Sequence, residues 1–253
     1  MKLKMFGTAA IIFCGLLILS FKKNTLPQCN TTFEPFALVE LFTSQGCSSC
    51  PPADELLAQT IEAAKKSGKK IYGLSFHVDY WNRLGWKDPF SSSSFSQRQK
   101  NYAAAFNLDG VYTPQMVVNG VGQFVGSSQS ALSKSLGEAF NTKPAVNFKT
   151  LTATYNSNKT IKVQYTLDGN IEASTINFAV VSLNETTVVK RGENSGLTLK
   201  NENVVQQMLT TTATASGEAT LENPSTLVKE NTAIIIFVQQ NNLKITGAAM
   251  VKN

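Results

Sequence analysis

The chain has 253 residues, of which 42% are hydrophobic and 16% charged, a composition typical of a globular protein with room for two modest domains. Beyond residue 23, no segment approaches the roughly 18 consecutive apolar residues that a membrane-spanning helix needs. Removing residues 1–23 takes away four lysines and no acid and lowers the formal net charge from +6 to +2, so the charge gives no indication of a nucleic-acid partner.

The N-terminus has the pattern of an export signal. Lys2 and Lys4 precede an apolar run over 6–21 that is short for a membrane anchor. A strong cleavage site is missing, which leaves an uncleaved N-terminal anchor as the alternative. We therefore expect residues 1–23 to form the signal or anchor and 24–35 a linker. The protein is expected in the periplasm or secreted, with membrane contact only through a retained leader.

The first elements form a strand–helix–strand unit. We predict, in chain order, a buried strand over 36–42, a helix over 51–66 and a second buried strand over 70–76. A crossover of this kind makes its two strands parallel, and parallel strands end at the same edge of the sheet. Cys47 and His77 are therefore predicted to lie at one edge.

The elements that follow complete an α/β domain over 36–143. A loop rich in Trp, Gly and Ser leads to a helix near 95–106, and the run 111–126 is typical of a hairpin with an Asn119-Gly120 turn. A helix over 128–140 precedes Lys143-Pro144, where the domain is expected to end.

From Ala145 onward the residues alternate and become rich in β-branched side chains. Short strands separated by polar turns favour an antiparallel sandwich over 144–253. The predicted strands span 146–155, 160–167, 176–183, 204–212, 233–240 and 243–251.

Cys47-Ser48-Ser49-Cys50 stands between the first strand and the first helix, which is the layout of a thioredoxin-type redox site. Unpaired backbone N–H groups and the helix dipole at that position favour a thiolate on the first cysteine. Cys47 is the expected nucleophile and Cys50 the resolving cysteine. A static structural disulfide is the alternative.

Two polar residues follow the second strand. His77, the only histidine, is a candidate for proton handling or metal binding, and a packed histidine is the alternative. Asp79 is a candidate for proton transfer with Cys50, or for a loop cap.

Pro114 starts a strand after a helix, and this position matches the cis-proline that thioredoxin folds hold beside their cysteines. Thr113 and Pro114 would then present backbone groups to a thiol substrate. Four aromatic residues are expected to line a substrate groove or to pack the long loop: Tyr80, Trp81, Trp86 and Tyr112.

Five motifs together resemble the secreted bacterial thioredoxin-like family catalogued as domain of unknown function 1223 (DUF1223). They are Val39 to Asp54 around the cysteines, Phe76 to Trp81, Gly85 to Phe90, Tyr112 to Gly120, and Arg191-Gly192-Glu193-Asn194. The resemblance covers about 36–251 and implies an α/β thioredoxin-like domain followed by an all-β antiparallel sandwich-like domain. It also favours a domain-contact role for Arg191, Glu193 and Asn194.

The function predicted from the sequence is that of an exported thiol–disulfide oxidoreductase that acts on protein cysteines in the cell envelope, without a cofactor. The redox direction and the substrate stay open. One alternative is a carrier of Cu(I) or another soft metal, with Cys47, Cys50 and His77 as ligands. Another is a partner-binding module in which the disulfide is structural.

Overall fold

The computed structural model describes residues 33–156, 160–222 and 228–252. The expected leader and nearly all of the expected linker lie outside these residues. Within the described ranges, no helix is both long and apolar enough to cross a membrane.

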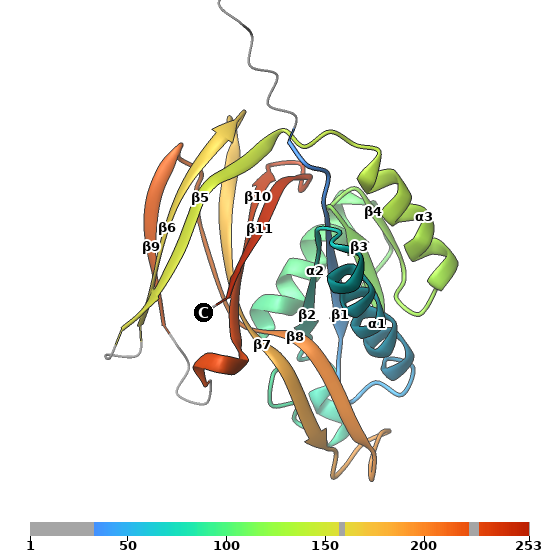
Figure 1. Ribbon diagram of the computed structural model, residues 1–253. Helices are drawn as coiled ribbons and strands as arrows, with labels where there is room; N and C mark the ends of the chain where they lie inside the picture. Colours follow the sequence, from blue (N-terminus) through green and yellow to red (C-terminus); the bar gives the residue numbers. More distant parts are fainter. Residues whose placement is uncertain (1–32, 157–159, 223–227, 253) are drawn as a thin grey trace, which may run out of the picture. The chain divides into compact units, whose positions relative to one another are not determined.

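Most of the described strands belong to one mixed sheet of eight strands (Figure 1). Its order is β11-β10-β7-β8-β2-β1-β3-β4. The strands are β1 Ala37–Thr43, β2 Ile71–His77, β3 Gln115–Val118, β4 Gly122–Val125, β7 Ser174–Val188, β8 Thr198–Thr212, β10 Thr232–Gln240 and β11 Ile245–Lys252. β2 pairs in parallel with both β1 and β8, and the other neighbours are antiparallel.

Three α-helices cover the β1–β4 part of this sheet in the described chain. They are α1 Pro51–Ser67, α2 Ser93–Ala105 and α3 Gln129–Phe140, and short 3₁₀ helices span Asn82–Leu84 and Lys229–Asn231. α1 and α3 pack against one face of β1 and β3, and α2 packs Phe95 and Tyr102 against the other face of β1. α1 begins with Pro51 directly after Cys50 and ends at Gly68, whose φ of 69° is readily adopted by glycine.

A second sheet consists of β5 Val146–Tyr155, β6 Thr160–Gly169 and β9 Ser216–Glu222, all antiparallel, in the order β5-β6-β9. Ile161 and Val163 of β6 belong to one apolar cluster with Phe178 of β7 and Ile236 of β10. Alternate residues of β7 and β10 point the other way, into the cluster that contains β1, β2 and α2. β7 and β10 therefore carry apolar side chains on both faces.

The predicted fold class was wrong. Instead of an α/β thioredoxin-like domain followed by an all-β sandwich-like domain, four strands from the second half continue the sheet of the first half. Ser75 of β2 pairs with Val204 of β8, and the Asn203 side chain donates a hydrogen bond to the Gly73 carbonyl at 3.0 Å. β8 thus covers the edge of β2, and strands that are apolar on both faces are buried in the middle of a sheet.

Candidate functional site

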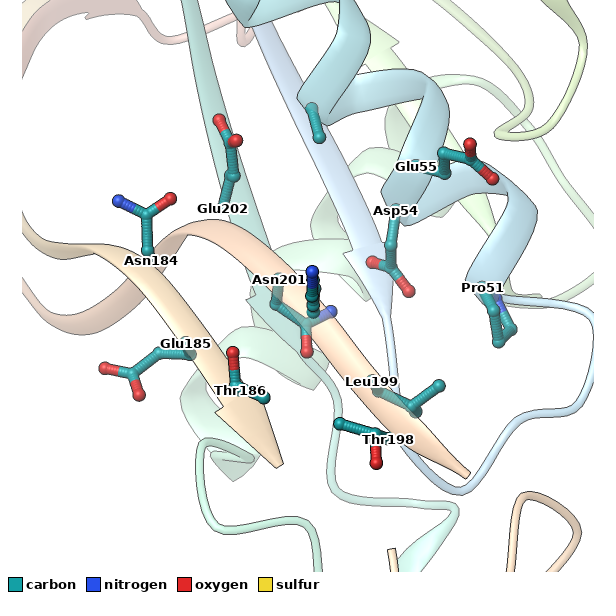
Figure 2. Close-up of a pocket in the computed structure, with 12 residues that line it drawn as sticks. Pro51, Asp54, Glu55, Asn184, Glu185, Thr186, Thr198, Leu199, Asn201 and Glu202 are labelled. Carbon is teal, nitrogen blue, oxygen red and sulfur yellow. The ribbon is translucent and has the colours of Figure 1, made fainter. Parts of the chain in front are cut away.

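A pocket of about 580 Å³ opens between the start of α1 and the strands β7 and β8 (Figure 2). Pro51 and Asp54 line it from α1, and Leu199 and Asn201 line it from β8. The pocket lies beside the cysteine pair, because Pro51 follows Cys50 directly.

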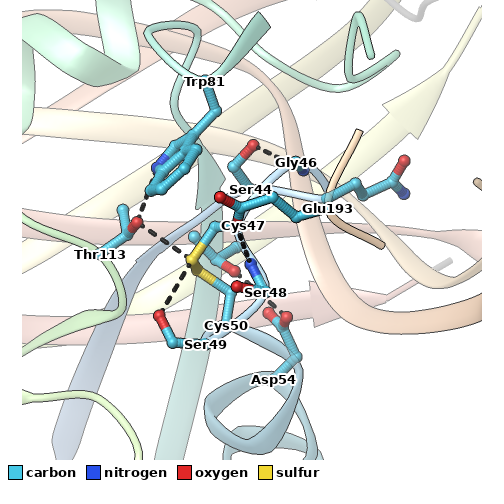
Figure 3. The surroundings of a disulfide bond; sticks show 12 residues. Ser44, Gly46, Cys47, Ser48, Ser49, Cys50, Asp54, Trp81, Thr113 and Glu193 are labelled. Carbon is cyan, nitrogen blue, oxygen red and sulfur yellow. Dashed lines mark hydrogen bonds between the residues drawn. A yellow bond between two sulfur atoms is a disulfide. The ribbon is translucent and has the colours of Figure 1, made fainter. Parts of the chain in front are cut away.

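Cys47 and Cys50 form a disulfide in the loop that joins β1 to α1 (Figure 3). Both cysteines are 0% exposed, whereas Ser48 and Ser49 between them are exposed. The site is therefore in its oxidised state, with its sulfur atoms shielded from solvent.

Two hydroxyl groups contact the sulfur of Cys47. Thr113 Oγ1 donates a hydrogen bond to Cys47 Sγ at 3.3 Å, and Ser49 Oγ lies 3.4 Å from the same atom. Trp81 Nε1 donates to Thr113 Oγ1 at 2.8 Å and so orients its hydroxyl. The Thr113–Pro114 peptide bond is cis, as predicted. Hydrogen-bond donors at sulfur stabilise a thiolate, so this arrangement favours the ionised form of Cys47 once the disulfide is reduced.

Residues 189–197, which connect β7 to β8, form a covering loop over the cysteines. The Ser48 backbone N–H donates to the Glu193 carboxylate at 3.0 Å, and the Ser48 hydroxyl together with this N–H lowers the pKa of Glu193. The buried Asn194 side chain donates to the carbonyl groups of Gln45 and Cys47, both at 2.9 Å. The loop thus holds the cysteine segment in place by side chains that come from the second half of the chain.

Asp54 lies one helical turn after Cys50, and its backbone N–H donates to the Cys50 carbonyl. Its side chain is 7% exposed, Oδ2 accepts a hydrogen bond from Thr43 at 3.1 Å, and Oδ1 has no hydrogen-bond partner. Burial raises the pKa of Asp54 to about 7, although interactions with His77, Thr43 and Asn201 lower it in part. This carboxyl group can therefore take up or release a proton near neutral pH.

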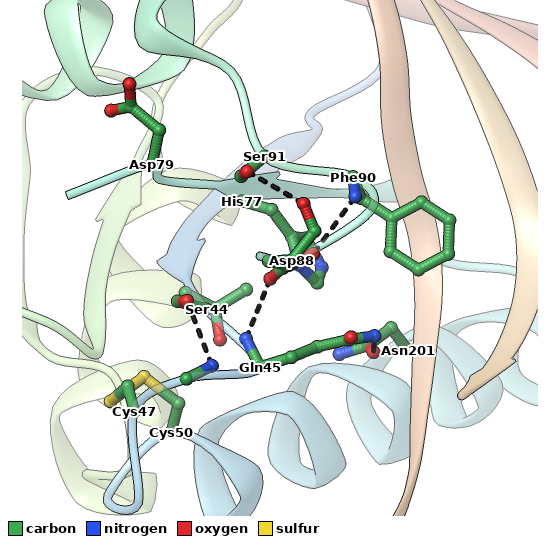
Figure 4. A network of polar contacts seen from close by, with 12 residues as sticks. Ser44, Gln45, Cys47, Cys50, His77, Asp79, Asp88, Phe90, Ser91 and Asn201 are labelled. Atoms are coloured by element: carbon green, nitrogen blue, oxygen red, sulfur yellow. Dashed lines mark hydrogen bonds and ion pairs between the residues drawn. A yellow bond between two sulfur atoms is a disulfide. The ribbon is translucent and has the colours of Figure 1, made fainter. Parts of the chain in front are cut away.

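His77 and Asp88 form a buried pair beside the cysteine loop (Figure 4). His77 Nδ1 donates to Asp88 Oδ2 at 2.7 Å, and Asp88 also accepts from the backbone N–H groups of Gln45 and Phe90. Burial lowers the pKa of His77, but the charge and hydrogen bond of Asp88, together with the charges of Asp54 and Glu185, outweigh burial and raise it overall. Burial likewise raises the pKa of Asp88, and the interaction with His77 outweighs it and lowers the pKa. Because Gln45 stands two residues before Cys47, this pair fixes the start of the cysteine loop.

The four aromatic residues predicted for a groove lie in different surroundings. Trp81 contacts Thr113, and Trp86 Nε1 donates to the side chain of Gln45 at 3.2 Å, so both tryptophans support the cysteine loop. The two tyrosines have other partners: Tyr80 donates to Gln99 and Tyr112 donates to Gln123.

Asp79 and Arg191 make no hydrogen bond to the sulfur atoms in the part of the chain that the structure describes. Asp79 accepts a hydrogen bond from the Ser96 hydroxyl at 2.5 Å and donates its backbone N–H to the same group, so it joins the loop after β2 to α2. Figure 4 shows its carboxylate directed away from the disulfide. Arg191 is exposed in the covering loop. The acid next to the cysteines is Asp54, which the sequence reasoning missed and which its position four residues after Cys50, on the buried side of α1, could have revealed.

A family model described as "Protein of unknown function (DUF1223)" matches residues 38–239. The chain belongs to this family. A crystal structure of a protein from Agrobacterium tumefaciens is similar to this DUF1223 chain, with a TM-score of 0.65 and 26% identity over 87% of this chain and 95% of that one.

Two further solved structures have lower similarity to this chain. A domain of the outer membrane lipoprotein Omp28 from Porphyromonas gingivalis has 15% identity and a TM-score of 0.27, over 43% of this chain and 88% of that one. A DUF3823 family protein from Bacteroides ovatus has 14% identity and a TM-score of 0.29, over 43% of this chain and 52% of that one. The comparison with curated proteins gives no significant match. The activity of this DUF1223 protein therefore has to be argued from the site itself.

The metal-carrier alternative would require Cys47, Cys50 and His77 to act together as ligands. Within the described ranges, no group of three or more His, Cys, Asp or Glu residues is arranged to hold a metal ion. His77 binds Asp88 through Nδ1 rather than joining Cys47 and Cys50 as a third ligand.

Proposed function

We propose that this DUF1223 protein is a thiol–disulfide oxidoreductase that exchanges the Cys47–Cys50 disulfide with cysteines of other proteins. The observation that carries the proposal is the different surroundings of the two cysteines. Cys47 Sγ has hydroxyl groups beside it, and Cys50 is followed one turn later by the buried carboxyl group of Asp54. A disulfide that only links two residues requires neither feature.

The exchange reaction uses each of these groups. Starting from the reduced protein, the Cys47 thiolate attacks a substrate disulfide, a mixed disulfide forms, and one substrate sulfur leaves as a thiolate. The Asp54 carboxylate then takes the proton of the Cys50 thiol. The resulting Cys50 thiolate attacks Cys47 Sγ, releases the second substrate sulfur as a thiolate and forms the disulfide seen in the structure. The same steps in reverse oxidise a substrate dithiol.

Access to Cys47 is controlled by the covering loop. Because both cysteines are 0% exposed, an incoming sulfur can reach Cys47 only after part of its surroundings moves. Residues 189–197, which contact the backbone of the cysteine segment through Glu193 and Asn194, are the part that we propose to move. The contact between Glu193 and Ser48 is exposed, and exposed ion-dipole contacts of this kind contribute little to stability. Movement of this loop is therefore part of the proposed exchange cycle.

The substrates that we propose are cysteines of exported proteins. The support comes from the basic and apolar pattern at residues 1–23 and from the disulfide, because disulfides persist in oxidising compartments such as the periplasm. The redox direction depends on the potential of this pair relative to its partners.

A second candidate is a partner-binding module in which the disulfide is structural. The complete burial of both cysteines favours it, since buried disulfides resist attack by external thiols. The two candidates differ in whether the native, folded protein exchanges its disulfide.

A trapping experiment decides between them. The Cys50→Ser variant, incubated while folded with a disulfide-bonded test peptide, is expected to accumulate a mixed disulfide, because the resolving sulfur is absent. Peptide mass mapping should place the adduct on Cys47 rather than on Cys29. The matched Cys47→Ser variant should accumulate none. Adducts that form only after unfolding in urea would contradict the oxidoreductase proposal and favour the structural disulfide.

A further inference from the structure

The pocket beside α1 shares one residue with the proposed exchange chemistry. Asp54 lines the pocket and also follows Cys50 by one helical turn. The volume of about 580 Å³ lies within the range of roughly 300–1,000 Å³ typical of small-ligand sites. A group bound here would therefore sit next to the cysteine that resolves the mixed disulfide.

The charged side chains around the pocket are mostly negative. Glu55, Glu185 and Glu202 line it, against the single ammonium group of Lys200, and Asp54 adds a carboxyl group that is partly ionised near neutral pH. A concave surface with charges of one sign concentrates ions of the opposite sign. The pocket is thus suited to a positively charged group.

An unsatisfied acceptor inside the pocket gives an independent indication of a ligand. Oδ1 of Asp54 has no hydrogen-bond partner although the side chain is 93% buried, given its 7% exposure. Figure 2 shows the carboxylate directed across the pocket toward Asn201 and Leu199 of β8. Buried polar groups are usually hydrogen-bonded, so this oxygen calls for a donor supplied from the pocket.

We propose that this pocket binds an ammonium or guanidinium group of the substrate, so that the protein exchanges disulfides with cysteines that lie near lysine or arginine. Such a group supplies the donor for Asp54 Oδ1 and the positive charge that the surrounding carboxylates attract. The cation site stands on the pocket itself, and the link to cysteine substrates rests on the proposed function.

The first part of the test measures binding to the oxidised protein, where no exchange takes place. N-acetyl-arginine amide is titrated and followed by NMR, with N-acetyl-citrulline amide as a neutral analogue of the same shape. The arginine probe should shift the backbone signals of Asp54 and Asn201, and the citrulline probe should leave them in place. Equal effects of the two probes would overturn the cation site.

The second part measures exchange. Two disulfide-linked test peptides differ only in carrying arginine or citrulline two residues from the cysteine, and the arginine peptide should react faster. Glu185→Gln and Glu202→Gln should each reduce this preference about three- to fivefold, because partly exposed ion pairs contribute that much. Glu172→Gln, which removes an exposed carboxylate from outside the pocket, is the matched control and should keep the preference.

The outcomes separate this inference from the proposed function. Equal exchange rates for the two peptides would overturn the substrate preference while leaving the oxidoreductase in place. Arginine binding without exchange of either peptide would support the cation site and overturn the oxidoreductase.

Discussion

Two buried carboxyl groups, Glu40 on β1 and Asp54 on α1, are held in opposite ways. Glu40 is 0% exposed and accepts hydrogen bonds from Arg98 Nε at 2.5 Å and Nη2 at 3.0 Å and from the Tyr102 hydroxyl. Burial lowers the pKa of Arg98, but its interactions with Glu40 and Tyr102 together outweigh burial and raise it overall. Asp54, by contrast, faces no cationic side chain among the described residues that neutralises it as Arg98 neutralises Glu40: Oδ2 accepts a hydrogen bond from Thr43, Asn201 lies close enough to lower its pKa, and Oδ1 has no partner by hydrogen-bond geometry.

The difference in pairing assigns the two carboxyl groups different roles: Glu40 stabilises the fold, and Asp54 is suited to proton transfer. The ion pair of Glu40 and Arg98 joins β1 to α2. Arg98 also donates a hydrogen bond to Gln239 of β10, so this pair connects three elements. Burial of a carboxyl group that is only partly paired favours its protonated form, and the pKa of Asp54 rises to about 7. A group with that pKa beside Cys50 is suited to proton transfer.

Removing the ion pair of Glu40 and Arg98 should have the largest effect on stability. Arg98→Met leaves Glu40 buried without its counter-charge, and we expect a loss of about 3–5 kcal/mol in the free energy of unfolding. Urea denaturation measures it. Lys100→Met, at an exposed position on the same helix, is the control and should change stability by less than about 0.5 kcal/mol. Similar losses in both variants would mean that the pair contributes nothing specific.

Asp54→Asn should change how stability depends on pH. The native protein keeps the Asp54 proton up to a pKa of about 7, whereas the unfolded chain releases it near the ordinary value of 3.8. The native state therefore binds more protons between these values, and stability falls as pH rises through this range. The stability of the variant should not fall in this range. At pH 8 its free energy of unfolding should exceed that of the wild type by up to about 4 kcal/mol. Parallel curves of stability against pH would refute the raised pKa.

Asn194→Ala tests the covering loop. The change removes two hydrogen bonds from a buried side chain to the cysteine segment, and we expect a loss of about 1–3 kcal/mol in stability. The disulfide should also react faster with a soluble reductant, because the loop is held less firmly. Lys190→Ala, at an exposed position of the same loop, should leave both quantities unchanged. An unaltered reduction rate in Asn194→Ala would argue against gating by this loop.

The smallest effect is expected at Thr113. Thr113→Val removes a hydroxyl donor from Cys47 Sγ and should raise the pKa of the reduced Cys47 thiol by up to about 1 unit. The pH dependence of alkylation in the Cys50→Ser background measures this pKa. An unchanged profile would show that Thr113 does not stabilise the thiolate.

Local patterns in the sequence predicted the surroundings of the disulfide well. The βαβ unit places Thr43 opposite His77 at the common ends of β1 and β2, and the Asn119-Gly120 turn joins β3 to β4 with φ angles of 48° and 66°. These features depend on residues that are close in the chain or on the handedness of short connections, which sequence patterns encode.

Pairing over long distances could not be predicted in this way. The alternation of β8 indicates a strand but does not identify β2 as its neighbour, about 130 residues earlier, so the sheet was wrongly divided into two domains. Asp54 was overlooked for a related reason. Its position in the first turn of α1 is typical of an ordinary helix-start acid, and although its place on the buried side of α1 was a signal, the packing of β8 beside that turn could not be predicted.

The central claim, that Asp54 transfers the proton of Cys50, is tested most directly by the rate at which a mixed disulfide on Cys47 resolves. A thionitrobenzoate adduct on reduced wild-type protein releases its chromophore when Cys50 attacks, and stopped-flow absorbance follows this from pH 5 to 9. We predict a rate that rises through an apparent pKa of about 7 and that Asp54→Asn slows about 100-fold near that pH. Identical rates and pH profiles in the two proteins would contradict the account.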